Sequence, residues 1–358
     1  MRALIALVAL QLAASGVSAQ VQIPPDATCS ECSIRLTRVA TLRGDHVVGT
    51  PRSVVRMPDG RFVVTFYPIS DEIIEFDSSG RFSRIVAPTG EGPGEVTGVG
   101  AMHLIRGDSL RVYDRGRMQT YAPGGGFAYS EALPIPAVSD AEPLGPGRAV
   151  VNTGTFIPRG GADPLRLVEN GQVTSAFGEE SDLPVTPTTP QLMVRSITSD
   201  AGGRVWSAGL TRYQIREWTA QGDPVRTWTR AVPWFEPWTL LAPVSPEAPP
   251  SARLVGIQWI GGDRLLVLLA APGEDWKSHL GPPASGRDGR TSYPQADFTR
   301  IFQSRIEILD LERGEVLAAS TDLPGAILLI DASHLAAYRE DEDGNPFVDI
   351  WQFEFVAG

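Results

Sequence analysis

Residues 53–86 read SVVRMPDGRFVVTFYPISDEIIEFDSSGRFSRIV, and this stretch decides the fold. It contains four short runs bounded by turn residues: Ser53–Met57, Arg61–Phe66, Glu72–Asp77 and Arg81–Val86. Each run is rich in β-branched or aromatic residues, and no helical period of comparable length appears. Pro58-Asp59-Gly60 separates the first two runs, and Ser78-Ser79-Gly80 separates the last two. The stretch therefore predicts a sheet of four antiparallel strands.

The same four-part pattern recurs along the chain. The glycines of the first turns are Gly60, Gly107, Gly147, Gly203 and Gly262, and those of the second turns are Gly80, Gly125, Gly171, Gly222 and Gly314. Within a repeat the two glycines lie 20, 18, 24, 19 and 52 residues apart, so four repeats keep a similar spacing and the fifth carries an insertion. Five such repeats in one chain indicate a repeat architecture.

A sixth repeat at the C-terminus has only three runs, Ala326–Ile330, His334–Tyr338 and Asp349–Val356. The missing fourth strand is available near the other end of the chain, where Ser33–Val39 alternates in polarity. Closing a ring with strands from both termini removes an exposed sheet edge. We therefore predict an all-β fold over residues 34–356, a six-bladed β-propeller of four-stranded antiparallel blades. Two stacked β-sandwiches are the alternative, which the regular turn spacing disfavours.

One part of the sequence resembles the NHL/TolB-like six-bladed propellers of bacterial exported proteins. The resemblance rests on Ile74-Glu75-Phe76-Asp77-Ser78-Ser79-Gly80-Arg81-Phe82, followed by Gly90-Glu91-Gly92-Pro93-Gly94-Glu95. It covers the first two blades well and fades beyond them. The family usually has Phe after the last Glu, where this chain has Val96. The resemblance implies the fold and an exported location, and it implies no particular activity.

The first 19 residues are typical of a signal peptide. Arg2 precedes an apolar run over Ala3–Ala14, and Val17-Ser18-Ala19 forms a small-residue cleavage site. The run is shorter than the roughly 20 apolar residues that a membrane span needs, and no later segment reaches that length. We expect a periplasmic or secreted protein with no membrane span, cleaved near Ala19.

The charge balance narrows the choice of partner. The chain has 31 Lys and Arg against 42 Asp and Glu, a net charge of −11. An acidic surface repels phosphate backbones, so we expect no nucleic acid partner.

The only two cysteines, Cys29 and Cys32, lie in the expected N-terminal tail, residues 20–33. In an exported protein a local disulfide that staples the tail is the first interpretation. A redox-active pair is the alternative, but the βαβ context of a thioredoxin-like motif is missing.

Alternate connections in an antiparallel blade lie on opposite faces of a propeller. The first-to-second and third-to-fourth turns are tight, whereas most second-to-third loops and links between blades are long. Long loops on a rigid scaffold often carry binding sites, so we predict that the long-loop face binds the ligand. Its candidate side chains are Trp234, Phe235, Trp238, Trp276, His279 and Tyr293. Alternatively, these rings cap the hydrophobic top of the blades.

Metal candidates are few. Asp341, Asp343 and Asn345 match the first three alternate ligands of a calcium loop, but Pro346 and Gln352 break the EF-hand pattern. A looser calcium site and a solvated acidic loop both remain open. His103 falls on an innermost strand, where side chains that face the channel can bind metal.

Two main functions follow. The first is a non-catalytic exported propeller that binds a protein, peptide, glycan or small molecule through its long-loop face; the absence of a Gly-x-Ser-x-Gly elbow and of a phosphate loop favours it. The second is a metal-dependent hydrolase or lyase that resembles the gluconolactonase, paraoxonase or amidating-lyase propellers. A central divalent metal such as calcium would then be its cofactor.

Overall fold

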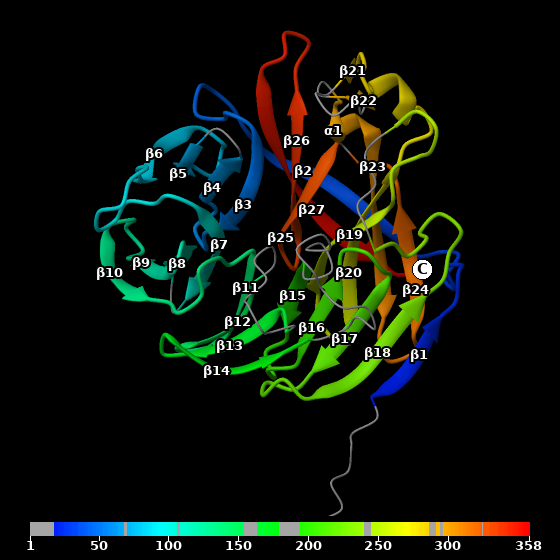
Figure 1. The fold of residues 1–358 in the computed structure, drawn as a ribbon, viewed down its shortest axis with the longest axis horizontal. Helices are drawn as coiled ribbons and strands as arrows, with labels where there is room; N and C mark the ends of the chain where they lie inside the picture. The colour runs from blue at the N-terminus through cyan, green and yellow to red at the C-terminus, as the bar shows by residue number, and fades with distance from the viewer. Residues whose placement is uncertain are drawn as a thin grey trace, which may run out of the picture.

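The computed structural model describes residues 18–67, 70–105, 108–153, 163–178, 194–239, 245–285, 291–293, 296–323 and 325–358. Six four-stranded antiparallel sheets follow one another around a central axis in chain order (Figure 1). This arrangement confirms the predicted six-bladed propeller. Nearly all of the regular structure in the described residues is β-strand, as the repeated runs predict.

The first three blades follow the predicted runs closely. Blade one contains β3 (Thr50–Arg56), β4 (Phe62–Tyr67), β5 (Ser70–Phe76) and β6 (Phe82–Ala87). Blade two contains β7 (Val99–Ile105), β8 (Ser109–Asp114), β9 (Arg117–Tyr121) and β10 (Phe127–Ala132). Blade three contains β11 (Asp140–Gly145), β12 (Arg148–Asn152), β13 (Leu165–Glu169) and β14 (Gln172–Phe177).

Of the other three blades, blades four and six each include a strand from the N-terminal segment, and blade five does not. Blade four contains β15 (Arg195–Ser199), β16 (Val205–Gly209), β17 (Gln214–Trp218) and β18 (Pro224–Arg230). Blade five contains β19 (Arg253–Trp259), β20 (Arg264–Pro272), β23 (Phe302–Asp310) and β24 (Glu315–Ser320). Blade six contains β25 (Ala326–Asp331), β26 (His334–Glu340), β27 (Pro346–Val356) and, as its outer strand, β2 (Ser33–Leu42).

Strand β2 closes the ring as the sequence predicts. It pairs antiparallel with β27 over its whole length, from Ser33 opposite Val356 to Leu42 opposite Val348. Leu42 is fully buried and belongs to a core cluster that joins blade six to blade one. The first blade also contacts this strand closely, since a Cβ at Gly80 would lie 2.1 Å from the Thr41 carbonyl oxygen.

The N-terminal segment forms a strap around the rim of blades four and five. Strand β1 (Ala19–Ile23), which the sequence does not predict, runs parallel to β18 and extends blade four to five strands. Ile23 is only 2% exposed and packs into the core between blades four and five. Further along, the Thr28 backbone N–H donates to the Val316 carbonyl of blade five at 2.9 Å. The expected tail is thus held against the outer strands of two blades.

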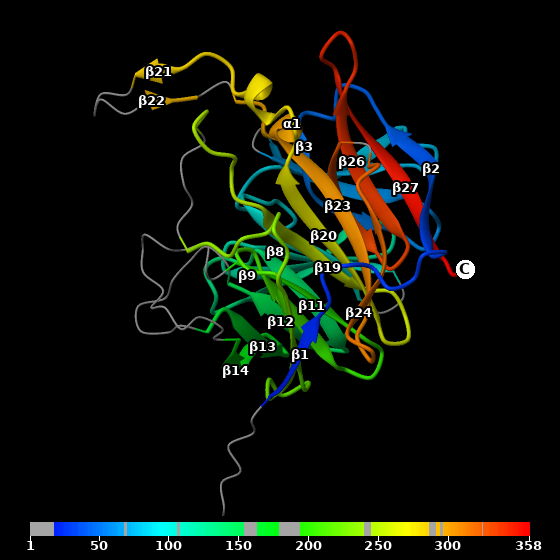
Figure 2. The same cartoon turned by 90° about the vertical axis from the view of Figure 1, so that its right-hand side faces the viewer.

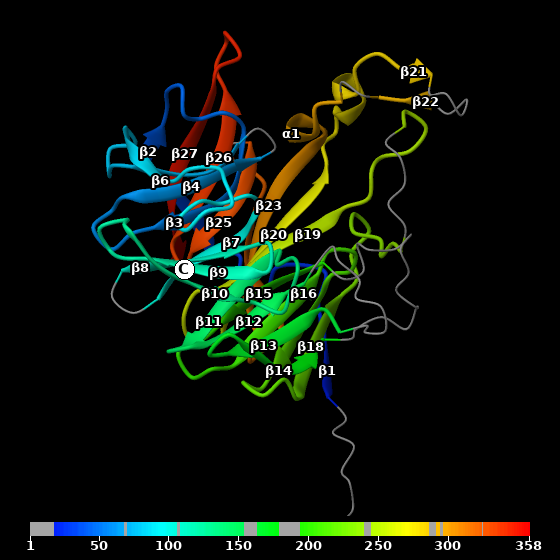
Figure 3. The ribbon, with the colours of Figure 1, turned by 60° about the vertical axis from the view of Figure 1, so that its left-hand side comes forward.

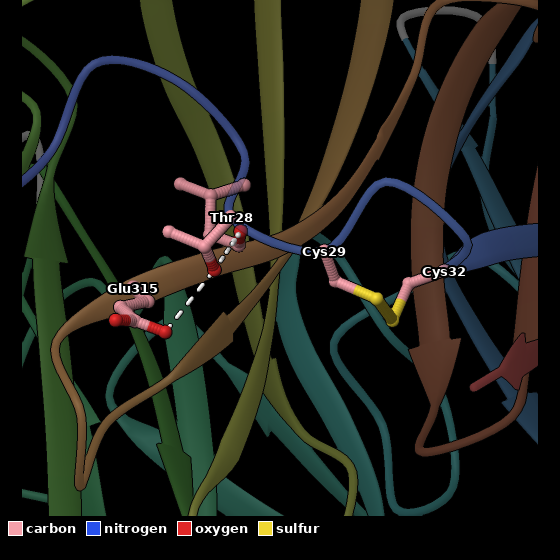
Figure 4. The surroundings of a disulfide bond; sticks show 5 residues. Thr28, Cys29, Cys32 and Glu315 are labelled. Carbon is pink, nitrogen blue, oxygen red and sulfur yellow. Dashed lines mark hydrogen bonds between the residues drawn. A yellow bond between two sulfur atoms is a disulfide. The ribbon is translucent and has the colours of Figure 1, made fainter. Parts of the chain in front are cut away.

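Cys29 and Cys32 form the predicted disulfide. The bond lies between the strap and β2, next to the contact of Thr28 with Glu315, where the hydroxyl donates at 3.1 Å (Figure 4). This position agrees with a local staple at the point where the chain turns from blade five to blade six. A redox role for the pair stays an untested alternative.

Four of the five acidic side chains buried within the described blades form ion pairs with arginine, and Glu217, 7% exposed, is the exception. Glu75, 3% exposed, pairs with Arg61 and lies 2.9 Å from Arg84. Three further acids at most 1% exposed also have arginine partners: Asp114 with Arg117, Glu307 with Arg230 and Arg305, and Asp349 with Arg38 and Arg339. A buried carboxylate without such a partner would cost several kcal/mol, of order 3–5.

Ring closure can be tested with two substitutions on β2. Leu42→Ala should lower the free energy of unfolding by about 2–5 kcal/mol, because it leaves a cavity between blades six and one. Val39→Ala on the same strand, where the side chain is 43% exposed, should change it by less than about 0.5 kcal/mol. Urea unfolding followed by tryptophan fluorescence measures both. Equal effects of the two substitutions would show that β2 is not an integral part of the ring.

Candidate functional site

The two faces of the propeller differ as the sequence predicts. Tight turns such as Gly60 and Asn170-Gly171 lie on one face. On the opposite face lies the blade-five insertion between β20 and β23, with η2 (Trp276–His279), β21 (Ala284–Ser285), β22 (Thr291–Ser292) and α1 (Phe298–Ile301). The β21–β22 hairpin extends well beyond the blades (Figures 2 and 3). The long loops expected at 152–164 and 178–192 fall mostly outside the described residues.

Three of the six candidate aromatic side chains on this face are buried. Phe235 is 2% exposed, Trp276 is 6% exposed and Trp238 is 8% exposed. The indole N–H of Trp238 donates to the Ala252 carbonyl at 2.8 Å. Their rings therefore pack inside the protein, which agrees with the alternative that they cap the blades.

The other three lie closer to the surface. Trp234 is half-buried, with the Arg305 guanidinium 4.9 Å from its ring centre. Tyr293 packs against the small core around Trp276, and His279 Nε2 lies 3.1 Å from Asp275 Oδ2. A ligand-binding role for Trp234, His279 and Tyr293 stays a prediction.

The predicted metal candidates do not come together. Asp341 Oδ1 accepts hydrogen bonds from the backbone N–H groups of Asp343 (3.0 Å) and Asn345 (2.9 Å), and the Asn345 side chain donates to it as well. These bonds lower the pKa of Asp341 and shape the turn between β26 and β27. His103 lies in a different blade, on β7. Among the residues that the structure describes, no three His, Cys, Asp or Glu side chains are grouped to hold a metal.

A central channel of about 610 Å³ runs between the innermost strands of all six blades. Each innermost strand contributes at least one residue to the wall of the channel; examples are Arg52, His103, Glu142, Arg195, Gln258 and Asp331. Channels of this size at the centre of a rigid ring are common ligand sites.

Two acidic side chains of β11, Asp140 and Glu142, line this channel. They are two residues apart on a strand, so they point to the same side. Asp140 Oδ2 accepts from the Ile197 backbone N–H at 3.0 Å. Glu142 Oε1 accepts from the backbone N–H and the hydroxyl of Ser199, at 2.9 and 2.8 Å. The pair thus bridges the inner strands of blades three and four, with Asp140 at the start of β11 and Glu142 bonded to Ser199, the last residue of β15, next to the tight turn that follows it.

The next pair of blades shows the same device with neutral side chains. Ser196 Oγ accepts from the Ile257 backbone N–H at 3.1 Å, and Thr198 Oγ1 accepts from that of Trp259 at 3.0 Å. Inner strands of different blades do not pair with each other, so side chains supply acceptors for their edge N–H groups. Hydroxyl groups suffice for this task between blades four and five. The link between blades three and four therefore does not require the negative charge of Asp140 and Glu142.

The channel raises the pKa of both carboxyl groups. Burial is the main cause for each, and it raises the pKa of Asp140 to about 6 and that of Glu142 to about 8. The charge of Asp140 raises the pKa of Glu142 further, against the hydrogen bonds from Ser199. Within the described part of the chain, neither group forms an ion pair with Arg, Lys or His. The pair differs in this respect from four of the five acids buried within the described blades.

No motif in the sequence points to Asp140 and Glu142. They occur in Asp140-Ala141-Glu142, directly before Pro143, in the weakest of the repeats. The available signal is their position, because the inner strands of blades one and two carry mainly Val, Met and Leu at the centre. Two acids at alternate positions of an inner strand could have been found by aligning the repeats.

Comparison with known proteins supports the fold. The sequence matches no family model and no curated protein. A solved member of the DUF4221 family from Bacteroides vulgatus ATCC 8482 is similar, with a TM-score of 0.61 and 11% identity; the match covers 91% of this chain and 99% of that one. An inferred exported protein of Bacteroides fragilis NCTC 9343 has a TM-score of 0.57 and 9% identity, with 94% and 100% covered. At such low identity the likeness establishes the propeller fold alone. Among the described residues, no helix has the length and apolar character needed to cross a membrane.

The raised pKa of Glu142 predicts how stability depends on pH. Its pKa in the folded chain lies above the unfolded value of 4.5, so the folded state holds the proton more tightly. The stabilising contribution is complete below pH 4.5 and is lost as the pH rises through about 8. Between pH 7 and pH 9, Glu142 should account for a loss of about 1.4 kcal/mol in the free energy of unfolding.

Urea unfolding of the wild type and of Glu142→Gln at both pH values measures this loss. The variant should lack it, because its amide does not titrate. Glu354→Gln serves as the control, since Glu354 is exposed and pairs with exposed Arg35 on the outer strands. An identical pH dependence in the wild type and Glu142→Gln would contradict the prediction.

Proposed function

We propose that this chain is an exported propeller of the NHL/TolB-like type that binds a small cationic ligand in its central channel. The observation that carries the proposal is the Asp140–Glu142 pair, which lines the channel half-buried, has raised pKa values, carries a charge that the link between blades does not require and has no basic partner among the described residues.

The charge of the pair selects the ligand class. Two carboxylates close together in a partly desolvated channel repel each other, and an ammonium or guanidinium group between them relieves that repulsion. Four of the five buried acids of the described blades meet the same need with arginine. In the channel, a cation from outside the chain would take the place of the arginine, and it would displace protons from the pair as it binds.

A divalent cation is the second candidate, because carboxylate oxygens are the ligands that calcium prefers. Two carboxylates alone fall short of the usual six to eight oxygen ligands. The metal-dependent hydrolase or lyase therefore depends on ligands beyond those grouped in the described residues. The same experiment separates the two candidates.

Isothermal titration calorimetry at pH 8.5 with 1,4-diaminobutane, 1,4-butanediol and calcium chloride tests the proposal. The diamine should bind, and Asp140→Asn/Glu142→Gln should weaken its binding by a factor of about 100, as expected when two charge-assisted contacts of about 1.5 kcal/mol each are lost. The diol should not bind, since it has the same length and no charge.

Glu354→Gln should leave diamine binding unchanged, because it removes a distant exposed carboxylate. Binding of calcium without the diamine would support the metal-dependent candidate instead. If neither cation binds, or if the double variant binds the diamine as tightly as the wild type, the proposed function is wrong.

A further inference from the structure

A second cavity, of about 580 Å³, lies between blades two and three on the face of the tight turns. Its mouth is formed by the turns at 145–147 and 170–171, opposite the face discussed above. Blade two contributes His103, Arg111, Tyr129 and Glu131 to its walls, and blade three contributes Pro143 and Pro146. The cavity does not include Asp140 or Glu142, although Pro143 directly follows Glu142 and His103 borders both the cavity and the channel.

Two neighbouring nitrogen atoms at this cavity have no hydrogen-bond partner within the described residues. They are His103 Nδ1 and Arg111 Nε, and both are buried. His103 and Arg111 stand directly opposite each other on β7 and β8, so their side chains lie side by side. Leaving such groups unsatisfied costs about 1–3 kcal/mol each, which makes the site favourable for a polar ligand.

The two nitrogen atoms have opposite hydrogen-bonding roles: one accepts and the other donates. Burial and the charge of Arg111 lower the pKa of His103 to about 3, so its ring is neutral at pH 7. Its hydrogen bond with the Ala141 backbone uses one ring nitrogen and leaves Nδ1 as an acceptor. Arg111 Nε is a donor. A hydroxyl group can donate to the first and accept from the second, whereas a carboxylate only accepts and an ammonium only donates.

The other side chains of the cavity have balanced charges, and one of them presents a flat aromatic ring. Arg111 is paired with Glu131 at 3.2 Å, so its charge is already compensated and does not call for an anion. The Tyr129 ring is 46% exposed, and the Arg111 Nη2 that donates to its hydroxyl at 3.3 Å holds it in place. An aromatic face beside proline rings suits the C–H face of a saturated ring.

From these features we propose that the cavity between blades two and three binds a neutral pyranose sugar. The sugar ring would lie against Tyr129, and one of its hydroxyl groups would bridge His103 Nδ1 and Arg111 Nε. This inference does not depend on the cation proposed for the channel, because the side chains that carry it are different.

Saturation-transfer NMR with the methyl α- and β-pyranosides of glucose, galactose, mannose and N-acetylglucosamine tests the proposal, with calorimetry on those that bind. At least one glycoside should bind, and Tyr129→Ala should weaken it about tenfold, the effect of losing one ring contact of about 1.4 kcal/mol. His103→Phe should also weaken binding, because it keeps a ring and removes the acceptor.

Two controls make the result specific. Phe82→Ala removes an aromatic ring of similar exposure, 40%, from the outer strand of blade one and should leave sugar binding unchanged. Glu354→Gln, which changes an exposed carboxylate of blade six, should also leave it unchanged. Circular dichroism confirms that each variant is folded. The proposal is overturned if none of the glycosides binds at millimolar concentration, or if Tyr129→Ala and Phe82→Ala weaken binding equally.

Discussion

The structure depends on one constraint: the blades of a propeller share no backbone ladder, so each inner strand presents an edge that must be satisfied by side chains. Among the described residues, strands form ladders only within their own blade, and a single backbone bond such as that from Leu254 to Leu210 joins one blade to the next. Apolar clusters such as that around Leu42 fill the space between blades, but they supply no acceptors for edge N–H groups. Hydroxyl and carboxyl side chains on the inner strands supply these acceptors instead, through Ser196, Thr198, Asp140 and Glu142.

This constraint explains why structural and functional roles meet in the same residues. Asp140 and Glu142 satisfy N–H groups of blade four, as Ser196 and Thr198 do for blade five. Their negative charge adds an electrostatic cost that a hydroxyl avoids, and the raised pKa values express that cost. Groups with strongly shifted pKa values are concentrated at functional sites. The proposed cation compensates the electrostatic cost.

The fold could be predicted because it depends on local signals. Turn glycines recur at regular spacing, and the incomplete sixth repeat matches the orphan strand Ser33–Val39, so the ring and its closure follow from the pattern. The strap strand β1 could not be predicted, because a five-residue edge strand held by parallel pairing has no turn to mark it. The site was harder still. Aromatic residues such as Phe235 and Trp276 stand out in the sequence, but loops also need cores of their own, and these rings fill them. Asp140 and Glu142 matter only because β11 lines the channel.

The most direct test of this account is the pKa of the Glu142 carboxyl group, measured from the ¹³C chemical shift of its Cδ between pH 4 and pH 10. We predict a midpoint near 8 in the free protein and a lower midpoint when 1,4-diaminobutane is present at saturation, because a bound cation stabilises the charged form. A midpoint near the ordinary value of 4.5 in the free protein, or one that the diamine leaves unchanged, would contradict the central claim that Asp140 and Glu142 bind a cation.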